Sequence, residues 1–102
     1  MNEKYIVTNG YLFEDKKGIK RLFAEVIEDP RWETGHHIVT SKVISVNTDK
    51  GVVITENGSE YVVRKFFTKE EFIAHLKDTF DEERVQYYLF YTNIMEWFYA
   101  KI

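Results

Sequence analysis

Histidine is the residue type in this sequence best suited to bind a metal or move a proton, and the chain has three histidines. His36 and His37 are adjacent, and His75 follows much later. If a strand begins at this pair, the two side chains point to opposite faces, so one ion cannot readily use both. Zinc usually takes three or four protein ligands. We therefore expect no metal site, with one of the adjacent histidines partly buried and the other exposed.

Hydroxyl and carboxylate side chains offer no clearer chemistry. Thr40 and Ser41 lie outside any Gly-x-Ser-x-Gly motif, so we expect a hydroxyl there to bond backbone groups at a bend or bulge. The 17 carboxylates fall mostly in predicted turns and first helical turns. The sequence does not pair two of them in an apolar pocket, as general acid–base catalysis would require. We predict no catalytic residue and no cofactor.

Composition indicates a globular protein of one domain. The chain has 102 residues, 44% hydrophobic and 30% charged, with a formal net charge of −3. It contains no cysteine, which excludes disulfides, thiolate metal sites and cysteine nucleophiles and suits a reducing compartment. We see no signal peptide, and no apolar run approaches the roughly 18 residues of a membrane span. We expect a cytoplasmic protein without a membrane partner.

A local basic cluster is the feature most suited to nucleic acid. Lys16, Lys17, Lys20 and Arg21 lie close together in the sequence. With exposed aromatic side chains, such a patch can bind single strands. However, residues 1–66 carry ten basic and ten acidic side chains, so the region as a whole is neutral. Nucleic-acid binding is therefore the alternative function, not the leading one.

Aromatic residues make up 17% of the chain, which is its compositional outlier. Phe90 and Trp97 lie seven residues apart among polar positions of the last predicted helix, including Gln86 and Asn93. Aromatic side chains are enriched in the cores of protein interfaces. These four residues, with Trp32, are the predicted partner-binding residues. The partner would be a host protein or a second copy of the chain.

The elements that must position these residues begin with a sheet over residues 4–66. Runs rich in Val, Ile, Thr, Tyr and Phe suit a pleated, half-buried surface. Residues 38–46, 52–56 and 61–66 are predicted to form three antiparallel strands, with a type I′ turn at Asn57-Gly58. Residues 4–13 form another strand, in which Asn9-Gly10 is either a tight turn or a bulge.

Residues 19–28 fit two interpretations. Their apolar positions match a helical stripe, and this alone favours a helix. However, Pro30 lies just beyond, and the sheet otherwise has few strands. We therefore favour a strand for this segment.

Two helices are predicted to follow the sheet, at residues 68–80 and 82–101. Thr68 and Glu71 form a capping box, and Asp81 is the predicted N-cap of the second helix. The first helix presents an apolar stripe of Phe72, Ile73, Leu76 and Phe80. The face of the second helix assigned to the sheet carries Tyr87, Tyr91, Ile94, Met95 and Phe98.

One tract also resembles a known family. From Trp32 to Val43 the sequence reads aromatic, two residues, Gly35, two residues, Ile38, one residue, Thr40-Ser41, one residue, Val43, and a hairpin follows. This Gly-x-x-Ile-x-Thr-Ser-x-Val tract resembles small β-rich proteins of phages, prophages and plasmids that have no assigned activity. The resemblance covers about residues 24–64. It implies a source in a mobile element and a compact β unit with a strand at residues 24–28, and it implies no catalytic residue.

The predicted fold is therefore α+β: a curved antiparallel sheet of about five strands, open or partly closed into a small barrel, followed by two C-terminal helices. The leading hypothesis for function is a non-enzymatic protein-interaction module. It would be encoded by a phage or prophage and would bind and occlude a host protein, such as a defence component. A nucleic-acid-binding accessory module is the alternative, and a small-ligand-binding or enzymatic domain is the third hypothesis.

Overall fold

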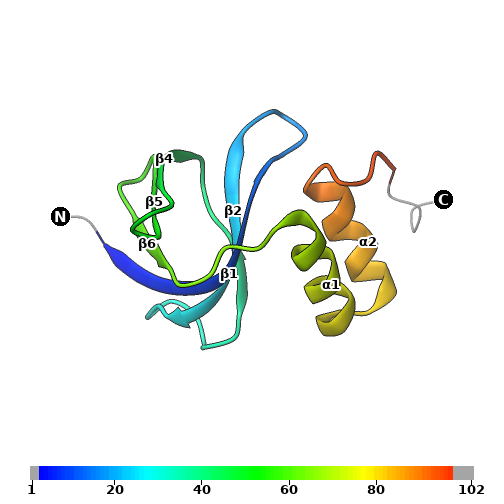
Figure 1. Cartoon of the computed structure of the whole chain (residues 1–102), viewed down its shortest axis with the longest axis horizontal. Helices are drawn as coiled ribbons and strands as arrows, with labels where there is room; N and C mark the ends of the chain where they lie inside the picture. Colours follow the sequence, from blue (N-terminus) through cyan, green and yellow to red (C-terminus); the bar gives the residue numbers. More distant parts are fainter. Residues whose placement is uncertain (1–2, 98–102) are drawn as a thin grey trace.

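A computed structural model of the chain describes residues 3–97, and it confirms the α+β class with six strands followed by two helices (Figure 1). The curled part of the sheet and the helices lie at opposite ends of the molecule, and the long strands β1 and β2 connect them. The elements are β1 (Lys4–Glu14), β2 (Lys20–Glu28), β3 (His37–Val39), β4 (Val43–Asn47), β5 (Val52–Thr55), β6 (Glu60–Val63), α1 (Lys69–Thr79) and α2 (Glu82–Tyr91).

The sheet differs from the prediction in strand number and in direction. Its order is β3-β2-β1-β6-β5-β4, and the central pair β1–β6 is parallel. The sixth strand arises because residues 40–42 divide the predicted strand 38–46 into β3 and β4. The sheet thus consists of two antiparallel units of three consecutive strands, β1-β2-β3 and β4-β5-β6, which meet at β1 and β6.

The link between β3 and β4 explains why the sheet is curled. These strands occupy opposite edges of the sheet. In a flat sheet of six strands the edges would lie about 24 Å apart, since neighbouring strands are about 4.8 Å apart. Four residue steps separate Val39 from Val43 and span at most about 14 Å. The two edges must therefore approach each other, and β4 indeed contacts β2 although they are not neighbours in the sheet.

Curling gives the sheet a concave and a convex face, and each has its own core. The concave core is lined by both units of the sheet, and its buried members are Tyr5, Val7, Leu22, Ala24, Val43, Val53, Tyr61 and Val63. The convex core lies between β1–β2 and the helices, with Phe13, Phe23, Phe72, Leu76 and Val85 buried. Leu22, Phe23 and Ala24 are consecutive and all buried, so both faces of β2 are covered. This is why residues 19–28 show no clean alternation, although they form the favoured strand.

Two local turn predictions had different outcomes. Asn9-Gly10 forms a bulge: the β1–β2 register shifts between Thr8 and Tyr11, and Asn9 has a φ of 54°. The predicted type I′ turn at Asn57-Gly58 is wrong, because only Gly58 of the two has a positive φ. The Gly58 amide donates to the Thr55 carbonyl instead, which is typical of a type I turn followed by a left-handed glycine.

The start of each helix is as predicted. The Thr68 hydroxyl accepts from the Glu71 amide at 3.2 Å, and the Glu71 carboxylate accepts from the Thr68 amide at 2.9 Å. The Asp81 carboxylate accepts from the Arg84 amide at 2.8 Å. Of the predicted stripe of α1, Phe72 and Leu76 are fully buried, while Ile73 and Phe80 are half-buried.

The second helix ends earlier than predicted, at Tyr91, and residues 98–101 of the prediction lie outside the described residues. Asn93 adopts a left-handed conformation with a φ of 65°. The amides of Asn93 and Ile94 donate to the carbonyls of Phe90 and Leu89, the pattern of a Schellman motif, which terminates a helix. The face of α2 that packs on the sheet also differs from the predicted one: Val85 is buried, whereas Tyr87, which was predicted to face the sheet, is 45% exposed.

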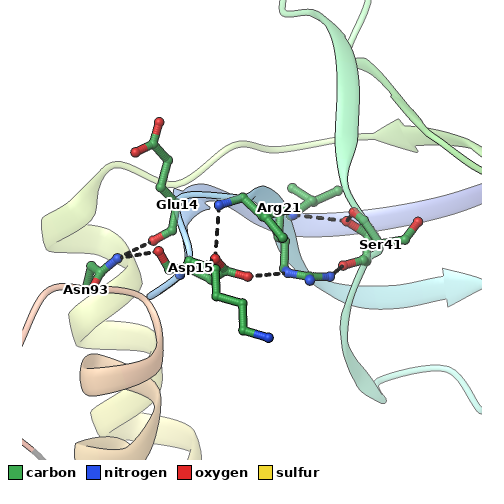
Figure 2. A network of polar contacts seen from close by, with 9 residues as sticks. Glu14, Asp15, Arg21, Ser41 and Asn93 are labelled. Atoms are coloured by element: carbon green, nitrogen blue, oxygen red, sulfur yellow. Dashed lines mark hydrogen bonds and ion pairs between the residues drawn. The ribbon is translucent and has the colours of Figure 1, made fainter.

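A polar network holds the β3–β4 link in place (Figure 2). The buried Asp15 carboxylate accepts hydrogen bonds from the amides of Lys17 and Ile19 and from Arg21 Nε, the last at 2.7 Å. Arg21 Nη1 then donates to the Thr40 carbonyl at 3.0 Å. The guanidinium group therefore connects the β1–β2 turn to the first residue of the link.

Thr40 completes this network with its side chain. Its hydroxyl accepts from the Leu22 amide at 3.0 Å and donates to the Ser41 carbonyl at 2.8 Å. The prediction that a hydroxyl at Thr40-Ser41 bonds backbone groups at a bend is confirmed. The link is thus fixed to β2 at the point where the chain crosses from one edge of the sheet to the other.

The network predicts a pH dependence of stability. The hydrogen bond from Arg21, followed by that from the Ile19 amide, lowers the pKa of Asp15 below its usual 3.8. The unfolded chain therefore takes up this proton at a higher pH than the folded chain does, so the contribution of Asp15 is complete above about pH 4 and is lost as the pH falls through the folded pKa. We expect Asp15→Asn to lower the free energy of unfolding at pH 7, and the difference from wild type to shrink below about pH 4.

Urea unfolding of wild type and Asp15→Asn from pH 7 to pH 3 measures the difference in their free energies of unfolding at each pH. Asp49→Asn, in the exposed turn between β4 and β5, is the matched control and should leave stability nearly unchanged. A difference between wild type and Asp15→Asn that stays constant down to pH 3 would contradict the assignment.

Candidate functional site

The structure separates the two aromatic residues that were predicted to form an interface on the last helix. Phe90 is half-buried on α2, and Lys16 Nζ lies 4.1 Å from the centroid of its ring. Trp97 lies beyond the end of the helix and is 64% exposed. The two residues share no helical stripe, because the Schellman motif at Asn93 ends the helix between them.

The two polar residues of that predicted surface also have different surroundings. Gln86 lines a shallow depression of about 380 Å³ with Phe80, Val85 and Leu89. The Asn93 side-chain amide donates to the carbonyls of Glu14 and Asp15, at 2.7 and 2.8 Å, and so attaches the end of α2 to the β1–β2 turn (Figure 2). Asn93 therefore has an intramolecular role.

The predicted basic cluster is divided in a similar way. Lys16 Nζ donates to the Met95 carbonyl at 3.1 Å besides contacting Phe90. Arg21 is engaged with Asp15 and Thr40. Lys17 and Lys20 are exposed. Three of the four cations, Lys16, Lys17 and Lys20, are therefore exposed on or beside the β1–β2 turn, whereas Arg21 belongs to the polar network.

Trp32, the remaining predicted partner-binding residue, is 46% exposed and lies in the loop between β2 and β3. Its indole ring stacks on the imidazole of His36, with ring centroids 4.6 Å apart and planes 5° apart. Within residues 3–97, Trp32 and Trp97 are the two exposed tryptophans, and only Trp32 is stacked in this manner.

The turn that carries Trp32 is held firmly. Asp29 forms a two-pronged ion pair with Arg31, with contacts of 3.0 and 2.8 Å, and its carbonyl accepts from the Trp32 amide. The Arg31 guanidinium also lies over the ring of Tyr5, 4.1 Å from the centroid, and donates to the hydroxyl of Tyr61. The exposed indole is therefore presented by an ordered turn.

A groove of about 330 Å³ begins at Trp32 and follows the edge of β3. Its other wall comes from the β5–β6 turn and β6, and its lining includes Arg31, His36, Ile38, Ser41, Asn57 and Ser59. Of the described strands, only β2 pairs with β3. The His36 carbonyl and the Thr40 amide bond to β2. Since hydrogen-bonding direction alternates along a strand, the backbone groups of His37 and Val39 point away from β2.

The second of the adjacent histidines points to the opposite face, as predicted, and meets two residues distant in sequence. His37 Nε2 lies 3.0 Å from His75 Nε2 on α1. Oε1 of Glu25 on β2 lies 3.7 Å from the former nitrogen and 3.9 Å from the latter. The three side chains, the Glu25–His37–His75 cluster, converge on one point between the convex face of the sheet and α1.

Aromatic rings enclose the cluster. The rings of Phe23 and Phe80 lie 5.8 and 4.9 Å from that of His37, and Phe67 lies 5.3 Å from His75. Burial, with the neighbouring His75 adding to the effect, lowers the pKa of His37 below 6.5. The imidazole of His37 is therefore neutral at neutral pH, the form in which histidine binds metals.

Glu25 was not among the predicted site residues, and therefore no carboxylate ligand was expected near the histidines. Glu25 and His37 are direct cross-strand partners of β2 and β3. The sequence alone does not give the register in which β2 and β3 pair, so it does not show that these two residues are neighbours. The available signal was a carboxylate inside the otherwise apolar run from Leu22 to Ile27. A charged residue at such a position usually needs a partner.

Comparisons with protein-family models, with curated proteins and with solved structures found no match. Within residues 3–97, neither helix is long and apolar enough to cross a membrane.

The position of Asn93 predicts a graded loss of stability. Asn93→Ala should lower the free energy of unfolding by about 2 kcal/mol, because it removes two hydrogen bonds and because alanine tolerates the left-handed conformation less well than asparagine does. Asn93→Gly keeps the conformation easily and should cost about 1 kcal/mol. Urea unfolding measures both values. Equal stability of wild type and both variants would show that this amide does not hold α2 to the β1–β2 turn.

Proposed function

We propose that the protein is a non-enzymatic protein-interaction module that binds an extended segment of a partner along the edge of β3. The observation that carries the proposal is an exposed tryptophan, Trp32, on an ordered turn at the end of a groove beside an edge strand. The resemblance of the tract from Trp32 to Val43 to proteins of phages, prophages and plasmids supports a bacterial host protein as the partner.

The chemistry of the groove favours an extended segment over a globular surface. An edge strand with free backbone groups can accept a further strand, and the hydrogen bonds then supply affinity. Asn57 and Ser59 add polar side chains along the opposite wall, and Ser41 adds one from the β3–β4 link. Trp32 supplies the kind of rigid aromatic anchor that dominates binding energy at many interfaces. We therefore expect the segment to place an apolar side chain against Trp32.

The experiment first identifies the segment. A photo-reactive benzoyl-phenylalanine in place of Ser59, in the groove, is cross-linked in a bacterial host lysate, and the attached peptide is identified by mass spectrometry. The same label in place of Asp49, outside the groove, controls for non-specific capture. The synthetic segment is then titrated into the purified chain by calorimetry.

The decisive comparison uses the two exposed tryptophans. Trp32→Ala should weaken binding of the segment at least about 30-fold, which corresponds to roughly 2 kcal/mol, the size expected for an aromatic hot spot. Trp97→Ala should change the affinity less than about twofold. The opposite result would move the interface to the C-terminal surface. A cross-link only to a second copy of the chain, with a dimer in sedimentation, would replace the host partner by self-association.

A further inference from the structure

We propose that Glu25, His37 and His75 bind one divalent transition-metal ion, with Zn²⁺ the expected ion. The three residues come from three different elements, β2, β3 and α1, which the chain folds together. Two imidazole nitrogens and one carboxylate oxygen are a ligand set that zinc uses in proteins, with a fourth position left for water or another ligand.

The distances between the ligand atoms carry the proposal. The triangle formed by the two Nε2 atoms and Glu25 Oε1 has sides of 3.0, 3.7 and 3.9 Å. The point equidistant from its corners therefore lies about 2.1 Å from each atom. Zinc–nitrogen bonds measure about 2.0–2.1 Å and zinc–carboxylate bonds about 2.0–2.2 Å. An ion at or just above this point would contact all three atoms with little side-chain movement.

The ligands are held on regular secondary structure. Glu25 and His37 face each other across β2 and β3, so sheet pairing fixes their separation. His75 lies one residue before the fully buried Leu76, which packs α1 onto the convex core. Side-chain exposures of 28%, 14% and 18% for Glu25, His37 and His75 show a cluster that is largely shielded yet reachable from solvent.

The outer contacts also suit a metal centre. The Asn9 side-chain amide donates to Glu25 Oε1 at 3.2 Å. A carboxylate oxygen has two lone pairs, so this bond leaves one free for an ion while it orients the group. Within residues 3–97, no other group of three histidine, aspartate or glutamate side chains converges in this way.

A hydrogen bond between two neutral imidazoles is the competing explanation of the 3.0 Å contact. It requires one ring to carry its proton on Nε2 and the other to accept through Nε2. It does not account for the position of Glu25 Oε1, which lies close to both nitrogens. Metal binding differs in a measurable way, because it leaves neither Nε2 atom protonated.

The test adds Co²⁺ and then Zn²⁺ to the tag-free chain. Tetrahedral Co²⁺ absorbs visible light, which reports the geometry, and calorimetry with Zn²⁺ reports the number of ions bound. We expect one ion per chain, displacement of Co²⁺ by Zn²⁺, and a higher melting temperature with Zn²⁺. Long-range ¹H–¹⁵N spectra should show that Nε2 of both His37 and His75 loses its proton signature when Zn²⁺ binds.

Three substitutions make the test specific. His75→Gln and Glu25→Gln should each weaken Zn²⁺ binding at least about tenfold, since even the loss of an outer-shell partner can cost that much. His36→Gln is the matched control: it removes the adjacent, exposed histidine and should leave the affinity within about twofold. If His75→Gln does not give a native circular dichroism spectrum, Glu25→Gln, which alters the most exposed ligand, still tests whether the cluster binds Zn²⁺.

Two results would overturn the proposal. The first is no uptake of Zn²⁺ or Co²⁺ by a wild-type chain with a native spectrum. The second is equal weakening by His36→Gln and by the two ligand variants, which would indicate binding by exposed histidine alone. Neither result bears on the groove along β3, whose test uses Trp32.

Discussion

The link of three residues between β3 and β4 is the constraint on which the rest of the structure depends. Because Thr40, Ser41 and Lys42 join strands at opposite edges, the sheet has to curl, and curling creates both cores. The concave face closes around its own side chains, and the convex face is left for the helices to cover. Arg21 and the Thr40 hydroxyl fix the link to β2, so a polar network holds in place the segment that makes the sheet curl.

The same short strand, β3, serves both candidate sites. Its side chains alternate, so His37 reaches the cluster under α1, while the preceding His36 stacks on Trp32 beside the groove. The adjacent histidines, which were predicted to point to opposite faces of the strand, thus belong to two different surfaces. Both surfaces depend on β3 remaining paired with β2. A ligand on either side therefore acts on the same three-residue strand.

Several features encoded by neighbouring residues could be predicted from the sequence, although the type of the turn at Asn57-Gly58 could not. The capping box at Thr68 and the N-cap at Asp81 depend on side chains only a few positions apart, and the bulge at Asn9-Gly10 was one of the two forms predicted there. Features that depend on distant contacts could not. Asn93 ends α2 with its amide bonded to the β1–β2 turn, and Glu25 joins the histidines only through the register of β2 and β3. Periodicity carries no information on either contact, so the cluster was not predicted, whereas Trp32 was predicted to bind a partner from its residue type alone.

The parallel pairing of β1 with β6 has a consequence for how the chain folds. Within the described sheet it is the one strand pair between segments far apart in sequence, since every other pair joins consecutive strands. The two units β1-β2-β3 and β4-β5-β6 can each form from local contacts, whose closure entropy is small. The two units join through β1 and β6, so β1 cannot complete its pairing until β6 has been synthesised. We therefore expect the pairing of β1 with β6 to be the rate-limiting step of folding, because it brings together the residues of the sheet that are farthest apart in sequence.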